Sequence, residues 1–428
     1  MRSASRTRVV SLYLALILSL ASPPARAGSA SSASNCNSTS VGFVPLIDLE
    51  AGLYHGFQGG LYPGGSNRRP VSHTSAGLAI ADAITPLDTL GISDPAHGRI
   101  VLASIGMSNT TMEFQAFLPK LNADPNRNPK LLAVDCAVGG QAANLIRNPN
   151  AAYWDSVAAR LRRAGSSPKQ VQAVWLKEAN ANPTGTFPAS AETLQWNLTS
   201  IVRILKQKLP NVKLAYVTSR IYAGYATTTL NPEPYAYESG FAVKWLIQSQ
   251  ISGDSLNYDP AKGTVEAPWL SWGPYLWADG LTARSDGLTW ACSEFSSTDG
   301  THPSTTGRDV VADSLLSFFQ NDTTTVPWFT KTVTGVATGS APAPAIRVYP
   351  VPARRTLTIL ANGFVAPMTL DLFTSGGRLV RTFQLERPWN ALSVPVGNLP
   401  SGIYYLRPRA TNARSGGPPG PLKVVIAR

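Results

Sequence analysis

Between residues 99 and 320, short continuous apolar runs alternate with longer amphipathic ones, and this alternation constrains the fold more than any other feature. Uninterrupted apolar, β-rich runs are typical of strands that are buried on both faces. Four stand out: 99–105 (RIVLASI), 131–138 (LLAVDCAV), 171–176 (VQAVWL) and 212–218 (VKLAYVT). Apolar residues at helical spacing mark the segments 109–121, 154–164, 191–209, 237–251 and 306–319. The pattern predicts an α/β domain with a parallel sheet sandwiched by helices, and a fifth strand is expected near 269–277.

The first 27 residues have the three parts of a secretory signal peptide. Arg2, Arg6 and Arg8 precede an apolar run over 9–21, and Ala25-Arg26-Ala27 forms a small-x-small cleavage site. The apolar run is short for a membrane span, so an uncleaved anchor is the weaker alternative. No later stretch approaches the roughly eighteen apolar residues of a membrane helix, and we expect no stable membrane insertion of the mature chain.

The net charge of +12 resembles that of a nucleic-acid-binding protein until it is divided along the chain. Residues 1–27 contain four Arg and no acid, and residues 331–428 contain twelve Lys and Arg against Asp371 and Glu386. Residues 28–330 therefore hold 21 basic and 23 acidic residues, a net charge of −2. A nearly neutral middle domain does not predict a groove for a polyanion, so no nucleic-acid partner is expected.

Three cysteines in an exported chain allow one disulfide and one free thiol. Cys136 and Cys292 both lie beside candidate site loops, and we predict that they pair, although Cys36 could replace either partner. The sequence has no C-x-x-C or His-rich spacing, so no metal or other cofactor is expected.

Three of the predicted strands are followed closely by a serine, a glycine pair and an asparagine. Ser108 comes after the first strand, Gly139-Gly140 after the second and Asn180 after the third. Open α/β sheets place their sites at the carboxyl ends of the strands, where a hydroxyl, close-approaching backbone N–H groups and an amide could act together. Taken singly, the three features are also explained by a helix N-cap, a tight turn and a loop residue with local hydrogen bonds.

A carboxylate and an imidazole precede the last helix. Asp299 and His302 are separated by two residues in a glycine-containing turn. A carboxylate held against an imidazole fixes its tautomer and stabilises its protonated form, as a general base in hydrolysis requires.

Together these residues form an order that is similar to a known family. The succession resembles the SGNH (GDSL-type) hydrolases in four blocks: 106–109 (GMSN), 135–140 (DCAVGG), 178–180 (EAN) and 299–302 (DGTH). The G-x-S-N and E-x-N forms are closer to the carbohydrate acetylesterase branch than to the lipase-like one. The resemblance covers residues 99–320 and implies a flavodoxin-like parallel sheet, the SGNH hydrolase fold.

The resemblance implies acyl transfer without a metal. Ser108 would attack an ester carbonyl, His302 would take and return the proton, and Asp299 would orient His302. The backbone N–H groups of Ser108 and Gly140 and the Asn180 side chain would form the oxyanion hole. Glu178 is expected to be structural.

Two residues depart from the family pattern. Met107 stands where the first block has Asp or Gln, and Lys177 stands where the third block has Gly. A lysine there would crowd the pocket or contact an anionic group. These departures favour an alternative function, a non-catalytic surface glycan-binding protein on a degenerate SGNH fold.

Aromatic residues are dense before the last helix. They could stack on sugar rings, although packing in the core is the simpler explanation. The residues concerned are Trp269, Trp272, Tyr275, Trp277 and Trp290.

The C-terminal residues differ in composition from the rest. A Pro- and Ala-rich linker over 331–345 precedes short strands with Gly and Pro turns, which predict a small all-β, Ig-like sandwich over 346–428. These strands resemble a type IX secretion sorting domain, on motifs at 349–353 (YPVPA), 377–380 (GRLV), 399–404 (LPSGIY) and 423–426 (KVVI). The resemblance implies contact with the type IX secretion machinery and a place outside a Gram-negative cell, secreted or on its surface. An adhesive or glycan-binding sandwich is the alternative.

We therefore predict a signal peptide (1–27), a hydrolase-like domain with an N-terminal extension (28–330), a linker (331–345) and a sorting domain (346–428). The leading hypothesis is a secreted serine esterase that acts on a small-molecule or glycan ester, with O-acetyl groups of polysaccharide as the expected substrate. A lipase or thioesterase would instead prefer longer acyl chains.

Overall fold

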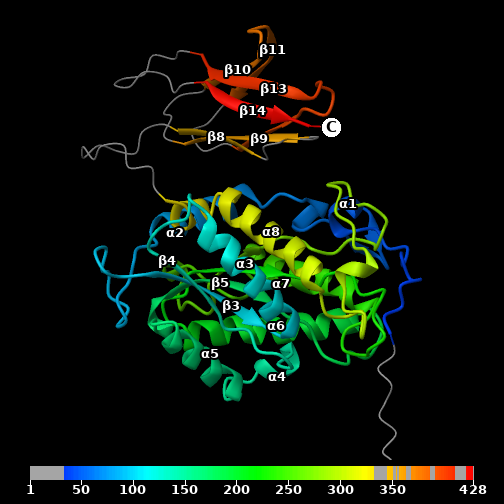
Figure 1. Cartoon of the computed structure of the whole chain (residues 1–428). Helices are drawn as coiled ribbons and strands as arrows, with labels where there is room; N and C mark the ends of the chain where they lie inside the picture. Colours follow the sequence, from blue (N-terminus) through cyan, green and yellow to red (C-terminus); the bar gives the residue numbers. More distant parts are fainter. Residues whose placement is uncertain are drawn as a thin grey trace, which may run out of the picture.

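The computed structural model describes residues 33–331, 345–349, 353, 356–362, 368–385, 391–409 and 421–427 (Figure 1). The predicted signal peptide lies outside these residues, as does the predicted linker apart from Lys331 and Ala345.

A five-stranded parallel sheet forms the centre of the larger part. Its strands are β3 (Ile100–Gly106), β4 (Leu131–Asp135), β5 (Val171–Lys177), β6 (Leu214–Thr218) and β7 (Trp269–Trp272). They are arranged in the order β4-β3-β5-β6-β7. Numbered along the chain this is 2-1-3-4-5, the order of flavodoxin-like sheets, whose topological switch point lies between the first and third strands. The predicted parallel sheet, including its fifth strand, is confirmed.

Helices cover both faces of this sheet (Figure 1). On one face α3 (Ser108–Ala123) packs against α8 (Thr305–Asn321), with α2 (Val71–Asp82) and α9 (Val326–Phe329) nearby. On the other lie α4 (Ala143–Ile146), α5 (Ala152–Arg163), α6 (Ala189–Lys208) and α7 (Tyr235–Ser252). Because both faces are covered, every residue of β3, β5, β6 and β7 is buried, which explains their continuous apolar sequences.

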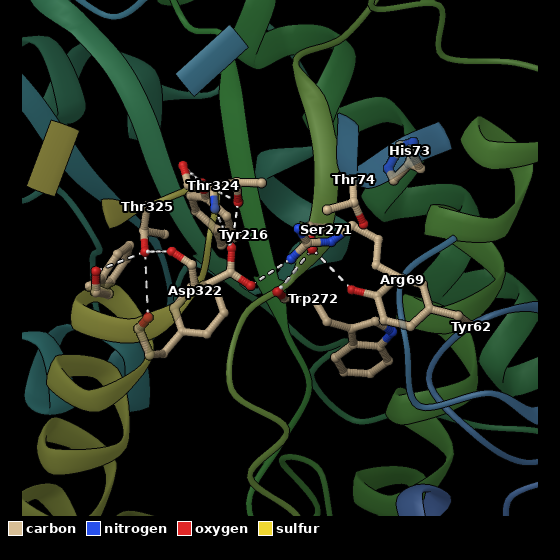
Figure 2. A network of polar contacts seen from close by, with 12 residues as sticks. Tyr62, Arg69, His73, Thr74, Tyr216, Ser271, Trp272, Asp322, Thr324 and Thr325 are labelled. Atoms are coloured by element: carbon tan, nitrogen blue, oxygen red, sulfur yellow. Dashed lines mark hydrogen bonds and ion pairs between the residues drawn. The ribbon is translucent and has the colours of Figure 1, made fainter. Parts of the chain in front are cut away.

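The N-terminal region covers the edge strand β7. It contains α1 (Leu46–Leu49), the short hairpin β1 (Leu53–Tyr54) and β2 (Phe57–Gln58), and α2. The Trp272 indole donates to the Leu61 carbonyl at 2.7 Å, and His73 Nε2 contacts the Leu270 carbonyl at 2.8 Å. Arg69 in this region forms an ion pair with Asp322, just after α8, at 2.7 Å (Figure 2). The extension is therefore an integral cover of the sheet.

The C-terminal part consists of two antiparallel sheets around a core of their own. One sheet has the order β11-β10-β13-β14 and the other β12-β9-β8. Leu357 and Ile359 of one sheet and Leu370 and Leu372 of the other are fully buried in the same cluster. This arrangement confirms an all-β region with two facing sheets. The strands are β8 (Ala345–Tyr349), β9 (Thr356–Asn362), β10 (Met368–Thr374), β11 (Leu379–Leu385), β12 (Ala391–Pro395), β13 (Gly402–Pro408) and β14 (Leu422–Ile426).

The predicted Cys136–Cys292 disulfide is wrong. Cys292 pairs with Cys36, and Cys136 is a buried free thiol. Cys136 directly follows β4 and its sulfur faces the Val157 carbonyl inside the domain, so it has no access to the loop of Cys292. The N-terminal segment instead lies along that loop, where the Ser34 N–H donates to the Ser297 carbonyl at 3.0 Å.

Candidate active site

Ser108 is the first residue of α3 and follows β3 after a single intervening residue. The turn before it is tight because Gly106 has a φ of 156°, and an added Cβ there would lie 2.3 Å from the Lys177 carbonyl oxygen. The Thr110 hydroxyl donates to the same carbonyl at 2.6 Å and ties the first turn of α3 to β5. Ser108 is thus held at the carboxyl end of the sheet, next to the switch point.

Ser108, His302 and Asp299 form a continuous hydrogen-bonded relay. Ser108 Oγ lies 2.8 Å from His302 Nε2, and His302 Nδ1 lies 2.7 Å from Asp299 Oδ2. In the neutral imidazole, Nδ1–H donates to the carboxylate and leaves Nε2 as the acceptor for the serine hydroxyl. The three residues predicted from the sequence therefore lie within hydrogen-bond distance of one another in series. Their geometry is that of a nucleophile, a base and its orienting carboxylate.

The Asp299 carboxylate is the fixed end of this relay. Partial burial opposes its ionisation, but hydrogen bonds from the N–H groups of His302 and Thr301 and from the His302 ring outweigh it. Together they hold the pKa of Asp299 below its usual value. Asp299 remains charged at neutral pH and can stabilise an imidazolium on His302.

The loop that carries Asp299 and His302 is anchored to two other elements. Gly300 has a φ of 58°, and an added Cβ would lie 1.9 Å from the Tyr225 carbonyl oxygen, so the loop lies directly against the segment after β6. The Thr301 carbonyl accepts from Asn109 Nδ2 at 3.2 Å and from Arg220 Nη2 at 3.4 Å. Because Asn109 follows Ser108 in sequence, one contact links the helix of Ser108 to the loop of His302.

The loop after β4 forms a four-residue turn beside Ser108. The Gln141 N–H closes the turn on the Val138 carbonyl at 3.3 Å, and Gly140 adopts a φ of 76°. The N–H groups of Gly139 and Gly140 take no part in that closing bond. An added Cβ on Gly139 would lie 3.8 Å from Ser108 Cβ, whereas none of the described atoms lies within 4 Å of one on Gly140. The turn thus passes Ser108 at Gly139, and an oxyanion role for Gly140 stays a prediction.

Asn180 follows β5, and its amide is oriented by a second amide. Asn197 Nδ2 on α6 donates to Asn180 Oδ1 at 2.7 Å, which leaves Nδ2 as the donor end of Asn180. The main chain is tied to the Gly139-Gly140 loop because the Ala143 N–H donates to the Ala179 carbonyl at 3.0 Å. The backbone N–H of Ser108, the glycine turn and the Asn180 amide therefore border the same end of the sheet.

Lys177 is engaged in an ion pair inside the domain. Its side chain is fully buried, and Nζ donates to both carboxylate oxygens of Glu113 on α3 at 2.5 and 2.7 Å. Two roles were expected for this lysine, crowding the pocket or contacting an anionic group. The structure shows the second, and the anionic group is the Glu113 carboxylate of the protein itself. Neighbouring Glu178 is also fully buried, and burial holds its pKa well above the usual value, as suits a structural carboxyl.

The aromatic residues before α8 belong to the core. Trp269, Trp277 and Trp290 are fully buried, and Trp272 and Tyr275 are exposed by 2% and 6%. They pack the domain and offer no face to a sugar.

Asn109, Asn197 and Arg220 support the site without having been predicted. The sequence did hold a signal for two of these residues. Asn109 lies beside Ser108, and Arg220 lies just after the fourth strand of the sheet. Asn197 lies inside a helix, and its contact with Asn180 had no sequence signal.

Comparison with known proteins supports the C-terminal prediction. Residues 347–415 match the family described as "Secretion system C-terminal sorting domain". The predicted type IX sorting domain is confirmed, and with it the expectation of export by that machinery to the medium or the cell surface. No helix among the described residues is long and apolar enough to cross a membrane.

Comparison with curated proteins gave no match. The solved structures that match include dimeric latent PorU of Porphyromonas gingivalis, at 16% identity over 21% of this chain and 10% of PorU, with a TM-score of 0.17. Protein YxiM of Bacillus subtilis is 12% identical over 54% of this chain and 58% of its own, with a TM-score of 0.28. An engineered protein is 15% identical over 74% of this chain and 59% of its own, with a TM-score of 0.17. All three TM-scores are low.

Proposed function

We propose that this protein is a secreted serine ester hydrolase of the SGNH type. The observation that carries the proposal is the relay from Ser108 Oγ through His302 to Asp299, with distances of 2.8 and 2.7 Å. Residues 194 and 3 positions apart in sequence meet in the order that nucleophilic acyl transfer requires.

In the proposed reaction, Ser108 Oγ bonds to the ester carbonyl carbon as its proton passes to His302 Nε2. The carbonyl oxygen becomes an oxyanion that the Ser108 N–H, the Gly140 N–H and the Asn180 amide stabilise. The intermediate then breaks its bond to the alcohol oxygen, which takes the proton from Nε2. A water molecule, activated by the same nitrogen, attacks the acyl-enzyme and restores free Ser108 with release of the carboxylic acid.

The departures from the family pattern are compatible with this chemistry. Lys177 is fully buried and paired with Glu113, so its side chain is not exposed in an open pocket. Met107 precedes α3 as its N-cap, in an extended conformation, and its carbonyl accepts from the Thr111 N–H at 3.0 Å. Neither residue interrupts the relay.

We further propose that the substrate is an extracellular glycan that carries ester-linked acyl groups. Acetyl groups are the first candidates. The sorting domain supports this choice because polysaccharides are large substrates that an exported enzyme can reach. The competing hypothesis is a surface glycan-binding protein that no longer catalyses.

Hydrolysis of 4-nitrophenyl acetate by the purified full chain tests the proposal. Ser108→Ala should lower kcat by about 10³-fold or more, since the serine is the covalent nucleophile. Ser252→Ala, at the exposed end of α7, is the matched control and should keep the wild-type rate. Equal rates for wild type and Ser108→Ala, or no hydrolysis of any of several esters, would refute the enzyme and favour the binding protein.

A further inference from the structure

The loop that carries the proposed base is tied covalently to the N-terminal segment (residues 33–42). This His302 loop (residues 292–303) begins at Cys292, which forms a disulfide with Cys36. The carboxylate and the imidazole of the relay follow within ten residues of that bond. The two cysteines are 256 positions apart in sequence, so the disulfide holds a distant part of the chain against the loop.

Backbone hydrogen bonds continue this contact beside the disulfide. The Ser34 N–H donates to the Ser297 carbonyl, inside the His302 loop, at 3.0 Å. The Asn35 N–H donates to the Tyr225 carbonyl at 3.0 Å. Gly300 packs against the same carbonyl, since an added Cβ on Gly300 would lie 1.9 Å from its oxygen. The N-terminal segment therefore contacts both the loop and the residue that supports it from behind.

The two ends of the N-terminal segment are held differently. Asp279, which is exposed by only 3%, accepts from the Ser40 hydroxyl at 2.5 Å and from the Val41 and Gly42 N–H groups at 2.7 and 3.1 Å. By contrast, residues 33 and 35–37 are exposed. Exposed hydrogen bonds near a chain end open readily, so the disulfide is the contact that keeps this end on the His302 loop.

The disulfide matters for the relay because the loop sets a distance between separate elements. His302 Nε2 lies 2.8 Å from Ser108 Oγ, which belongs to α3. The contacts of Asn109 and Arg220 with the Thr301 carbonyl anchor the end of the loop, and the disulfide anchors its beginning. A loop with one anchor can shift, and a misplacement of about 1 Å in a catalytic group can lower a rate by about 100-fold.

The disulfide is also open to exchange with thiols. Cys36 is exposed and Cys292 is partly exposed, so a thiol reagent can reach the bond. Cys136 is fully buried, and burial raises the pKa of its thiol, so it does not compete for either partner.

We propose that the Cys36–Cys292 disulfide positions the relay, so that the protein is active in its oxidised form and nearly inactive as a dithiol. The inference rests on the proposed esterase function and names its regulation. On oxidation, the two thiols lose two protons and two electrons to the disulfide of a thiol oxidant, which becomes two thiols while the protein S–S bond forms. Because such bonds form in oxidising compartments and not in the cytosol, the enzyme gains its activity only after export.

Reduction of the folded full chain provides the first test. Hydrolysis of 4-nitrophenyl acetate is measured for the oxidised chain, for the chain reduced with dithiothreitol and desalted under nitrogen, and for the chain reoxidised with glutathione disulfide. Reduction should lower kcat by about tenfold or more and change KM by less than about twofold, because the disulfide positions the base without touching the substrate. Reoxidation should restore kcat.

Three variants separate positioning from stability. Cys36→Ser/Cys292→Ser should have the kcat of the reduced chain and should not respond to dithiothreitol, whereas Cys136→Ala should respond as wild type does. Leu205→Ala is the control for a general loss of stability, because it removes a fully buried side chain. Leu205 lies near the end of α6 that leads into β6, away from the carboxyl ends of the strands, so this variant should keep the wild-type kcat.

Amide hydrogen exchange, followed by mass spectrometry, distinguishes this inference from the proposed function. Residues 292–303 should exchange faster in the reduced chain than in the oxidised chain, and Leu205→Ala should not show this local change. If the loop responds in this way but the oxidised chain hydrolyses no ester, the proposed function fails and the hold of the disulfide on the loop is supported. Equal exchange in both redox forms, an active enzyme whose kcat does not fall on reduction, or an equal fall of kcat in Leu205→Ala would each overturn the inference.

Discussion

The ion pair between Lys177 and Glu113 makes a quantitative prediction about stability. Both side chains are fully buried, and both carboxylate oxygens accept from the single ammonium group. Lys177→Met keeps a similar volume but leaves the Glu113 carboxyl without its partner. Removing one member of a buried pair costs about 3–5 kcal/mol, because the remaining charge has lost its solvent and its counter-charge.

Thermal and urea unfolding of the full chain would measure the effect. A cost of that size corresponds to a fall in Tm of about 6–20 °C for a domain of this order of size. Lys177→Met/Glu113→Leu should recover most of the loss, since apolar replacement of a whole buried pair is often neutral. Lys120→Met is the control, because the ion pairs of Lys120 with Asp309 and Asp313 are solvent-exposed and worth about 1 kcal/mol or less.

The pH dependence gives an independent check. Burial raises the pKa of Glu113, and loss of Lys177 should raise it further. The folded variant then binds a proton more readily than the unfolded chain, so its stability relative to wild type should rise as pH falls from 7 towards 5. A single variant within about 1 kcal/mol of wild type, or a double variant less stable than the single one, would refute the reasoning.

Three further predictions follow from other contacts. Asn109→Leu removes the amide that links the helix of Ser108 to the Thr301 carbonyl. For the proposed esterase, the change should lower kcat by about 10–100-fold with KM nearly unchanged, measured by steady-state kinetics on an aryl acetate; an unaltered kcat would contradict the positioning role. Cys36→Ser/Cys292→Ser opens a covalent loop between residues 256 positions apart, and should lower the free energy of unfolding by about 2–5 kcal/mol in urea titrations, whereas Cys136→Ala should not reproduce this loss. Burial lowers the pKa of His73 to about 4, so at this residue the unfolded chain binds more protons than the folded one between pH 4 and 6.5. The free energy of unfolding of wild type minus that of His73→Gln should therefore rise by about 3 kcal/mol across that window.

The elements of the larger domain were predictable because their signals are local. The run at 171–176 is apolar because both faces of β5 are covered, and the helical spacing in 191–209 reflects one buried side of α6. The relay of Ser108 and His302 was found because parallel strands bring their carboxyl ends to one edge, which makes loop order informative about space.

Contacts decided by packing between distant segments were not predictable. The pairing of Cys36 with Cys292 depends on the path of the N-terminal segment along a loop, which has no periodic signal. From the sequence, Lys177 was expected to crowd the pocket. Its partner Glu113 lies on a helix 64 residues earlier, so nothing near Lys177 in the sequence indicated the ion pair. The side to which a residue at a strand end points is set by the helix packed against it.

The contact of Arg69 with Asp322 has a consequence for the order of folding. It joins residues 253 positions apart, over the strand β7 that would otherwise be an open edge of the sheet. Until α8 and the turn after it are present, the N-terminal region that covers β7 lacks the ion pair between Arg69 and Asp322. An uncovered strand edge favours pairing between chains. Contacts of such long sequence separation also slow folding. A chain truncated before Asp322 should therefore aggregate, and an exported chain can close this edge only after most of its length has emerged.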